Sequence, residues 1–333
     1  MNNRQIILAE VPKGELKTSH FEMRSAPMPE PGENDILVKT LYMSLDAANR
    51  AWMQGPSYRG AVKSGDVMPT YMIGRVATSR YASIPEGSLV EIEGEWADYV
   101  VVAGDQAKIV PETNPLSNRL SVLGIAGKTA YFGLLNVGRP QAGETLVVSA
   151  AAGSVGSIVG QIGKIKGCRV VGIAGGKEKC AWLVDELGFD AAVDYKAGNL
   201  FKDLKAACPD GVDVYFDNVG GSVLETVLFQ MNLHGRIACC GAVSQYDTAN
   251  PVGPRNLPGL LVVKRIRMEG FIVMDFAEHD MQAEADLAEW ASSGQLKVIE
   301  DIVDGLESAP SALIGLLGGK NRGKRMVRVA ADG

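Results

Sequence analysis

One segment of the chain joins a short apolar run to closely spaced small residues, a pattern that can bind a phosphate. It covers residues 145–156 and reads T-L-V-V-S-A-A-A-G-S-V-G. The apolar part predicts a buried strand, and Ala151, Gly153 and Gly156 occupy the three small-residue places of a G-x-G-x-x-G turn. A helix that begins near Gly153 would point its free N–H groups and positive dipole end at an anion. The segment therefore indicates a dinucleotide pyrophosphate site, with tight strand-to-helix packing as the alternative.

The end of the next predicted strand indicates which dinucleotide would bind. A carboxylate about 20 residues after the glycine turn would hold an unphosphorylated ribose. Here Gly175 and Gly176 follow the strand instead, and Lys177 and Lys179 come directly after them. These lysines favour NADP over NAD. The alternative is a solvated helix start, which is mildly unfavourable for lysine because the helix dipole repels cations there.

Two further turns follow predicted strands. Asp217, Asn218 and a pair of glycines come after the apolar run V-D-V-Y-F, and Gly241 with Ala242 comes after the run R-I-A-C-C. The carboxyl ends of strands in an open α/β sheet form the ligand-binding edge. Either turn alone could serve only chain reversal, but their shared position predicts one cofactor-binding edge.

The elements that must position these turns change character along the chain. From the start to about Leu120 the pattern is short strands separated by Pro, Gly and Asn, which predicts a β-rich region. After Leu123 a helix around residues 128–136 precedes regular strand–helix alternation, which predicts a doubly wound parallel α/β sheet of Rossmann type. The six strands are expected at 145–148, 168–174, 191–195, 212–218, 236–242 and 266–273, with helices at 177–187, 222–231 and 278–292. Residues 297–333 read as strand, helix and strand.

Composition limits the kind of protein. The chain has 333 residues, 46% of them hydrophobic and 22% charged, with a formal net charge of -6, which argues against a broad nucleic-acid-binding surface. No apolar run approaches the roughly 20 residues of a membrane span, and residues 1–12 lack a secretory pattern, so we expect a cytoplasmic protein without membrane partners. The cysteines show no C-x-x-C spacing and the histidines form no metal motif, so we expect free thiols and no metal site.

Seven motifs along the chain carry a family resemblance. They are Y-M-S-L-D-A-A-N-R-A-W-M, G-I-A-G-K-T-A-Y-F-G-L-L, A-A-A-G-S-V-G, F-D-N-V-G-G, C-G-A-V-S-Q-Y, R-M-E-G-F-I-V and G-K-N-R-G-K. In these motifs and in their order, the chain resembles the prostaglandin reductase and curcumin reductase branch of the zinc-independent medium-chain dehydrogenases. The similarity runs from Tyr42 nearly to the end of the chain.

The resemblance implies a GroES-like β-rich catalytic domain at 1–122 and 298–333, and a Rossmann domain at 123–297 that binds NADPH. The positions it assigns to the cofactor are Gly153, Ser154, Val155 and Gly156 at the pyrophosphate, Lys179 and Tyr195 at the adenosine ribose phosphate, Asn218, Cys240 and Ala242 at its middle, Phe271 and Val273 at the nicotinamide, Thr129 at its edge and Asn321 from the tail. We add Gly175, which ends the strand before the lysines. Tyr195 could equally be an aromatic that covers the core.

The reaction that the resemblance implies is reduction of a carbon–carbon double bond conjugated to a carbonyl. The enolate formed on the way needs a hydrogen-bond donor at its oxygen. Two tyrosines common in the family are absent, because Ala48 and Val263 stand in their places. Tyr246 and Tyr58 remain as candidate donors, and Asn49 with its neighbour Arg50 could replace the missing polar group; either tyrosine could instead only anchor a loop.

Substrate and assembly are less closely defined. The resemblance predicts a small apolar enone or enal as substrate, with quinone reduction as one alternative and a noncatalytic NADPH-binding sensor as another. The pocket depends on loops around Tyr58, Tyr71 and residues 251–261, which no motif defines. By analogy with the family we expect a homodimer that pairs through the edge strand predicted at 266–273.

Overall fold

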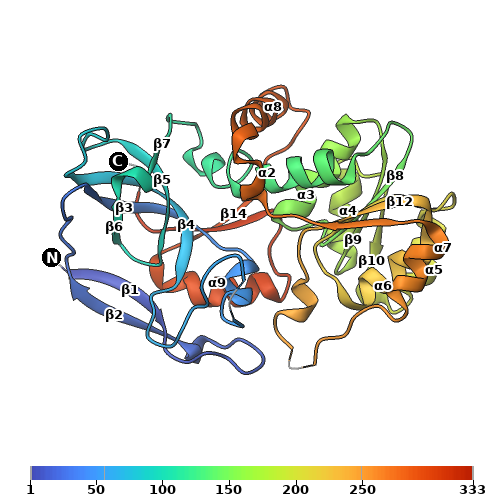
Figure 1. Ribbon diagram of the computed structural model, residues 1–333, viewed down its shortest axis with the longest axis horizontal. Coiled ribbons are helices and arrows are strands. Elements are labelled where there is room, and N and C mark those ends of the chain that lie inside the picture. Colours follow the sequence, from blue (N-terminus) through green and yellow to red (C-terminus); the bar gives the residue numbers. More distant parts are fainter. Residues whose placement is uncertain (1, 56, 249, 332–333) are drawn as a thin grey trace. The chain divides into compact units, whose positions relative to one another are not determined.

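The computed structural model describes residues 2–55, 57–248 and 250–331, which form two units (Figure 1). The first unit contains the residues up to 120, 300–320 and those from 325 on, and the second contains 121–299 and 321–324. The sequence placed these divisions at 122 and 297. It also assigned 321–324 to the catalytic domain, whereas these residues belong to the second unit, because the Gly323 N–H donates to the Ala152 carbonyl oxygen at 2.9 Å.

The second unit is built on a parallel sheet of six strands, in the order β10-β9-β8-β11-β12-β13. The strands are β8 (Thr145–Ser149), β9 (Arg169–Ala174), β10 (Ala191–Asp194), β11 (Val212–Asp217), β12 (Met231–Cys239) and β13 (Arg267–Gly270). From β8 the chain adds β9 and then β10 on one side. It then returns to the other side of β8 and adds β11, β12 and β13 there. This order confirms the predicted doubly wound Rossmann-type sheet.

Helices cover both faces of this sheet, which explains why every residue of β8 is buried. Leu146 and Val148 face one apolar core and Val147 faces the other. The first core receives side chains from α2 (Ile125–Phe132), α3 (Ser154–Ile165), α4 (Lys177–Asp185) and α8 (Asp280–Ser292). The second receives them from α5 (Leu200–Ala207), α6 (Gly221–Gln230) and α7 (Leu257–Lys264).

Some predicted boundaries were wrong. β13 ends at Gly270 rather than at 273, because Val273 begins a 3-10 helix that runs to His279. The predicted loop 251–261 contains the start of α7, where Pro258 lies in the first turn and needs no amide hydrogen for a helical bond. The sequence also missed α5, and the helix expected at 128–136 is α2, continued by a π-helix at Gly133–Gly138.

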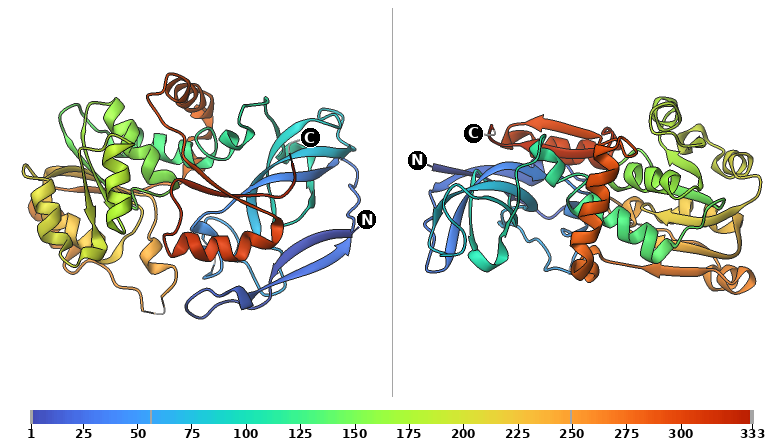
Figure 2. Two further views of the ribbon diagram at one scale, coloured as in Figure 1. Left: turned by 180° about the vertical axis from the view of Figure 1, so that it is seen from behind. Right: turned by 90° about the horizontal axis from the view of Figure 1, so that it is seen from above.

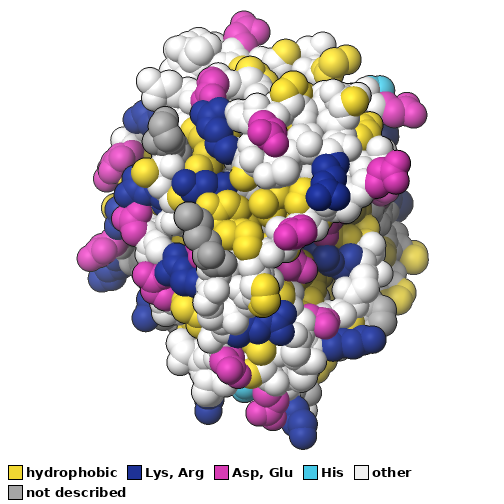
Figure 3. Space-filling model, turned by 90° about the vertical axis from the view of Figure 1, so that its left-hand side faces the viewer, with side chains coloured by type: hydrophobic (Ala, Val, Ile, Leu, Met, Phe, Trp, Pro, Cys, Tyr) yellow, Lys and Arg dark blue, Asp and Glu magenta, His cyan; other side chains and the backbone are white. Residues whose placement is uncertain are grey.

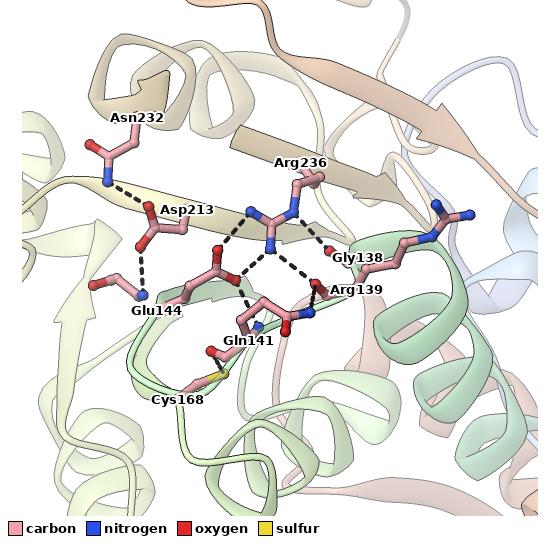
Figure 4. Close-up of polar contacts among 9 residues, drawn as sticks. Gly138, Arg139, Gln141, Glu144, Cys168, Asp213, Asn232 and Arg236 are labelled. Atoms are coloured by element: carbon pink, nitrogen blue, oxygen red, sulfur yellow. Dashed lines mark hydrogen bonds and ion pairs between the residues drawn. The ribbon is translucent and has the colours of Figure 1, made fainter. Parts of the chain in front are cut away.

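Polar contacts fix the amino ends of three neighbouring strands (Figure 4). The Arg236 guanidinium on β12 donates through Nη1 to Oε1 of Glu144, which precedes β8, at 2.9 Å, and through Nη2 to the carbonyl oxygen of Arg139 at 3.0 Å. The Asp213 carboxylate on β11 accepts hydrogen bonds from the Thr145 N–H and from Nδ2 of Asn232. These contacts hold β8, β11 and β12 in register, so their carboxyl ends finish level.

The first unit contains a seven-stranded sheet and a separate two-stranded one. Its strands are β1 (Asn2–Leu8), β2 (Phe21–Pro27), β3 (Asp35–Ser44), β4 (Pro69–Ser79), β5 (Leu89–Glu95), β6 (Tyr99–Ala103), β7 (Lys108–Ile109), β14 (Glu300–Asp304) and β15 (Lys324–Arg328), and its helices include α1 (Ala48–Ala51) and α9 (Ala309–Leu317). The strand, helix and strand expected in the tail are β14, α9 and β15.

The tail strands complete the large sheet of the first unit, because β15 pairs antiparallel with β3. The views in Figure 2 show this C-terminal segment among the strands of the N-terminal part. On the face drawn in Figure 3, hydrophobic side chains gather in a central patch, and basic and acidic side chains are intermixed around it. Within the described part of the chain, no helix is long and apolar enough to cross a membrane.

Candidate functional site: a nucleotide-binding edge

The strand register brings the predicted turns to one edge of the six-stranded sheet. Phe216 pairs with Val148, and Asp217, at the end of β11, pairs with Cys239 at the end of β12. The chain therefore leaves β8, β11 and β12 at the same level, and the turn after β9 lies next to them. Parallel strands with this arrangement bind ligands at their carboxyl ends.

The glycine turn after β8 has the close approach that its spacing predicted. Ala150 adopts a left-handed conformation with φ of 48°, which is unfavourable for a residue with a side chain. A Cβ atom at Gly156 would lie 2.4 Å from the Ala150 carbonyl oxygen, so any larger residue there would push the helix away from the turn. Packing therefore accounts for Gly156, and the pyrophosphate role of Gly153 and Gly156 stays a prediction.

Unsatisfied polar groups at the start of α3 suit an anion. Gly153 is the N-cap residue and provides no side-chain cap. The N–H groups of Ser154, Val155 and Gly156 have no acceptor among the described residues. The Ser154 hydroxyl oxygen is buried and also lacks a hydrogen-bond partner in the described part of the chain. Buried polar groups are normally paired, so this combination fits a bound pyrophosphate.

Lys179 and Asn321 lie together, although one is on α4 and the other is in the tail. Lys179 Nζ donates to the Asn321 carbonyl oxygen at 2.5 Å. The Asn321 side chain is 6% exposed and donates from Nδ2 to the Gly323 carbonyl oxygen at 2.8 Å. The bridge between Gly153 and Gly323 holds this tail segment beside the glycine turn. Two predicted cofactor residues from distant parts of the sequence thus occupy one location.

The turn after β9 contacts the turn after β10. A Cβ atom at Gly175 would lie 2.9 Å from Cε1 of Tyr195 and 2.9 Å from Cε of Lys196, so both side chains lie over this glycine. The Asp194 carboxylate joins the same two turns, because its Oδ1 accepts from the Gly176 N–H at 2.7 Å and from the Lys196 N–H at 2.9 Å. Tyr195 is 46% exposed, so its ring does not belong to the core.

A buried polar network holds the turn after β11. Asn218 donates from its N–H to the Ser149 hydroxyl at 2.9 Å and from Nδ2 to the Ser149 carbonyl oxygen at 2.8 Å. Oδ1 of Asp217 accepts from the Tyr215 hydroxyl at 2.7 Å and from the Gly220 N–H at 2.9 Å. Asp217 is 2% exposed, and burial raises its pKa. The network ties the ends of β8 and β11 together and orients the Asn218 amide.

The turn after β12 is anchored by Tyr246. Its hydroxyl oxygen accepts a hydrogen bond from the Ala242 N–H at 3.0 Å. Burial raises the pKa of Tyr246, which keeps the phenol protonated at neutral pH. The pKa of the Cys240 thiol rises to about 12, also through burial. Tyr246 is therefore a loop anchor by its contacts, and its role as proton donor stays a prediction.

The remaining predicted cofactor residues lie on neighbouring elements of the second unit. Thr129 Oγ1 donates to the Ile125 carbonyl oxygen within α2 at 2.6 Å. The Phe271 ring contacts the Phe216 ring edge-on, with centroids 6.1 Å apart. Val273 is 9% exposed and starts the 3-10 helix after β13. Their backbone roles at a nicotinamide stay predictions.

The candidate residues of the first unit differ in exposure. Asn49 is 1% exposed, and its amide binds backbone on both sides: Oδ1 accepts from the Asp46 N–H at 2.8 Å, and Nδ2 donates to the Pro69 carbonyl oxygen at 3.0 Å. Tyr58 is 50% exposed and accepts from Trp52 Nε1 at 3.1 Å. Asn49 thus holds α1 against the start of β4, whereas the half-exposed Tyr58 ring packs edge-on against the Trp52 ring, with centroids 6.5 Å apart.

Tyr71 is a further phenol in the first unit, on β4. Burial raises its pKa to about 12, and the nearby Glu93 and Tyr58 raise it as well. Tyr71 and Tyr58 therefore lie close enough to influence each other. The residues that replace the two missing family tyrosines offer no polar side chain: Ala48 begins α1, and Val263 on α7 is 66% exposed.

Comparison with known proteins assigns the family. A model described as the N-terminal domain of oxidoreductase matches residues 4–110, and one described as zinc-binding dehydrogenase matches residues 154–290. The chain is 43% identical to the NADPH-dependent curcumin reductase of Escherichia coli K12, over 99% of this chain and 98% of that protein. It is 40% identical to the 2-alkenal reductase (NADP(+)-dependent) of Nicotiana tabacum, over 100% and 99% respectively.

The chain belongs to the zinc-independent enone reductase group of the medium-chain dehydrogenase/reductase family. The fold agrees with this assignment. The crystal structure of CurA from Vibrio vulnificus in complex with NADPH superposes with a TM-score of 0.94 at 41% identity, covering 99% of this chain and 100% of that one.

One of the two family models is described as zinc-binding dehydrogenase, but the described residues of this chain contain no side-chain cluster that could bind zinc. Among residues 2–55, 57–248 and 250–331, no group of three or more His, Cys, Asp or Glu side chains could hold a metal ion. All five cysteines are free thiols.

Several residues that shape this enone reductase's nucleotide edge were not identified from the sequence. Asp194 and Lys196 flank Tyr195, and Ser149 supports Asn218. For the first pair, the available signal was a carboxylate near the end of the strand predicted at 191–195 and a lysine directly after that strand. Ser149 gave none, because a serine after an apolar run is common and its partner lies 69 positions away.

Proposed function

We propose that this chain uses NADPH to reduce the carbon–carbon double bond of α,β-unsaturated ketones or aldehydes. The observation that carries the proposal is the gathering of the predicted cofactor residues at one edge of the parallel sheet, in a chain 43% identical, over almost its whole length, to an NADPH-dependent curcumin reductase. The 2-alkenal reductase at 40% identity supports the same substrate class. The buried, unpartnered Ser154 hydroxyl and the free amides beside it fit the pyrophosphate of this cofactor.

When bound, NADPH supplies the hydride for such a reduction. The chain's own residues hold it at defined places: Gly153 to Gly156 at the pyrophosphate, Lys179 with Tyr195 at the ribose phosphate, and Asn218 at the middle. The amide of Asn218 is oriented in advance, because Ser149 holds both its N–H and its Nδ2. Because the Asn218 amide is already oriented, less conformational entropy is lost when the cofactor binds.

The chain must also stabilise charge on the carbonyl oxygen of the substrate. We assign this to a phenol, with Tyr246 and Tyr58 as the candidates. A protonated phenol suits the task, because it can donate a hydrogen bond as negative charge develops on oxygen. We assign Asn49 a positioning role, since its amide binds the backbone of Asp46 and Pro69 and its side chain is 1% exposed.

The test is a substrate panel with the purified chain and NADPH. An enone, an enal, a quinone and the matching saturated ketone are compared by the loss of NADPH absorbance, and products are identified by mass spectrometry. We expect the enone and enal to yield the saturated carbonyl and the saturated ketone to be inert. Reduction of the quinone alone would replace the proposal with quinone oxidoreduction. Tight NADPH binding without turnover of any substrate would indicate a noncatalytic sensor.

We also propose that the protein is a homodimer that pairs through β13. This strand forms one edge of the six-stranded sheet, and unpaired edges are templates for pairing with another chain. Val262 and Val263 on the nearby α7 are 74% and 66% exposed, which adds apolar surface. Light scattering should give twice the mass of 35.4 kDa, and a mass of one chain would exclude the dimer.

We place the protein in the cytoplasm. The free state of its five cysteines fits a reducing compartment. Cell fractionation with an antibody against the chain tests this, and recovery from a membrane or secreted fraction would contradict it.

A further inference from the structure

We propose that Lys196 is a second cation for the 2′-phosphate of NADPH, beside Lys179, and that it contributes to the preference for NADPH over NADH. The inference rests on the proposed use of NADPH. It concerns one residue of this chain and does not depend on which substrate is reduced.

The position of Lys196 is the first argument. Its Cε and the Cε1 of Tyr195 each lie 2.9 Å from where a Cβ would stand on Gly175. The lysine stem therefore lies across the end of β9, where the adenosine ribose is held in sheets of this kind. A side chain at position 175 would require Tyr195 and Lys196 to shift.

The charge of the Lys196 ammonium group also supports the proposal. Lys196 Nζ lies 5.8 Å from the centroid of the Tyr195 ring. No acidic side chain within residues 2–55, 57–248 and 250–331 forms an ion pair with it. By contrast, Lys179 Nζ already donates to the Asn321 carbonyl oxygen at 2.5 Å. Lys196 thus brings to this strand end an ammonium group that forms no ion pair with a carboxylate among the described residues.

The anchoring of the Lys196 backbone is the third argument. Oδ1 of Asp194 accepts from both the Gly176 N–H and the Lys196 N–H, so one carboxylate holds the turn after β9 and the turn after β10 together. The position of Lys196 relative to Gly175 is therefore set before any ligand binds. The Asp194 carboxylate also adds negative charge near this turn, which increases the need for more than one cation.

The charge balance agrees with a second cation. A phosphate monoester carries about -1.5 to -2 charges at neutral pH. The turns after β9 and β10 and the first turn of α4 carry the ammonium groups of Lys177, Lys179 and Lys196 and the carboxylates of Glu178 and Asp194. Glu178 lies 3.7 Å from the Arg322 guanidinium. One lysine alone would leave a ribose phosphate only partly neutralised.

The experiment compares Lys196→Met with the wild-type chain. Methionine keeps an unbranched stem over Gly175 and removes the charge. The matched control is Lys202→Met, an exposed lysine on α5. Dissociation constants are measured by titration calorimetry for NADPH, NADH, 2′,5′-ADP and 5′-AMP, which do not require turnover, and thermal unfolding checks that each variant is folded.

We expect Lys196→Met to weaken NADPH and 2′,5′-ADP by about tenfold, as for loss of one charge-assisted contact, and to change NADH and 5′-AMP by less than about twofold. Lys196→Arg should retain most of the phosphate selectivity, and Lys202→Met should behave as wild type. Equal weakening of all four ligands, or no change in any, would overturn the proposal.

The outcome is separable from that of the proposed function. If the wild-type chain binds NADPH selectively but reduces no enone or enal, the proposed function fails and the role of Lys196 is still decided by the four dissociation constants. If the chain reduces enones while Lys196→Met leaves the ratio of NADPH to NADH affinity unchanged, only the role of Lys196 is wrong.

Discussion

The ammonium group of Lys179 and the backbone carbonyl of Asn321 form a hydrogen bond of 2.5 Å between residues 142 positions apart in the sequence. The bond joins α4 to the tail segment 321–324 within the second unit. Gly323 extends this connection, because its N–H donates to the Ala152 carbonyl oxygen in the glycine turn at 2.9 Å. The predicted ribose-phosphate lysine and the pyrophosphate turn are therefore held by the same four-residue segment.

Lys179→Ala should weaken NADPH binding by about tenfold or more and NADH binding much less, because a hydrogen bond to a charged group contributes about 1.5–3 kcal/mol. Titration with each nucleotide gives the two dissociation constants. The variant also loses the charged hydrogen bond to Asn321, so its unfolding free energy should fall by about 1–3 kcal/mol. Equal weakening of both nucleotides would place Lys179 outside the phosphate site.

Ser154→Ala should have opposite effects on the free and the bound chain. Removing a buried hydroxyl without a partner should leave the unfolding free energy unchanged or raise it by up to about 1 kcal/mol. Loss of a phosphate contact should weaken NADPH by roughly threefold to tenfold. Urea unfolding without ligand and calorimetry with NADPH check the two parts. Ser157→Ala is the control, because its hydroxyl already donates to the Ser154 carbonyl oxygen; an identical response of both variants would contradict the assignment.

Asp217→Asn should make stability less dependent on pH. Burial raises the pKa of Asp217, so the folded chain binds this proton more tightly than the unfolded chain. Binding of this proton adds to the unfolding free energy. Its contribution is largest below the ordinary carboxyl pKa of about 3.9, and it is lost as the pH rises through the raised pKa of Asp217. The variant keeps Oδ1 as an acceptor without the charge, so its unfolding free energy should decline less than that of the wild type between about pH 4 and 7.

Asp217→Ala is the companion variant. It removes the acceptor of the Tyr215 hydroxyl and the Gly220 N–H, so it should lower the unfolding free energy by at least about 2 kcal/mol. Urea titrations across the pH range measure both variants. A pH profile of Asp217→Asn that coincides with that of the wild type would show that the carboxyl titrates normally.

Tyr246→Phe should lower turnover far more than NADPH affinity if its hydroxyl meets the substrate oxygen. Loss of one oxyanion donor costs about 2.7–4 kcal/mol, or roughly 100-fold to 1,000-fold in kcat. Loss of the bond from the Ala242 N–H should cost only about 1 kcal/mol of stability. Tyr215→Phe is the control, because its phenol is fully buried and can affect stability but not contact a substrate. An unchanged kcat for Tyr246→Phe would direct attention to Tyr58.

The apolar runs and small-residue spacings were sufficient to predict the second unit's sheet. Five of its strands begin within one residue of their predicted positions because a parallel strand covered on both faces must be continuously apolar. β12 and β13 were predicted less well. β12 starts five residues earlier than expected, and β13 stops at Gly270 because the chain coils into a 3-10 helix at Val273. The local pattern of apolar residues does not show where a strand stops pairing with the adjacent strand.

The sequence alone predicted a nucleotide-binding turn at 151–156, and it showed that lysines follow β9 and an amide follows β11, because each of these groups comes directly after its strand. Only the tertiary structure decided which groups are paired: Lys179 with Asn321, Asp194 with Gly176, Asn218 with Ser149, and Asn49 with the backbone of Asp46 and Pro69. The physical reason is that a hydrogen bond depends on atoms within about 3 Å of each other. Packing of distant segments sets that distance, and residue type and spacing do not.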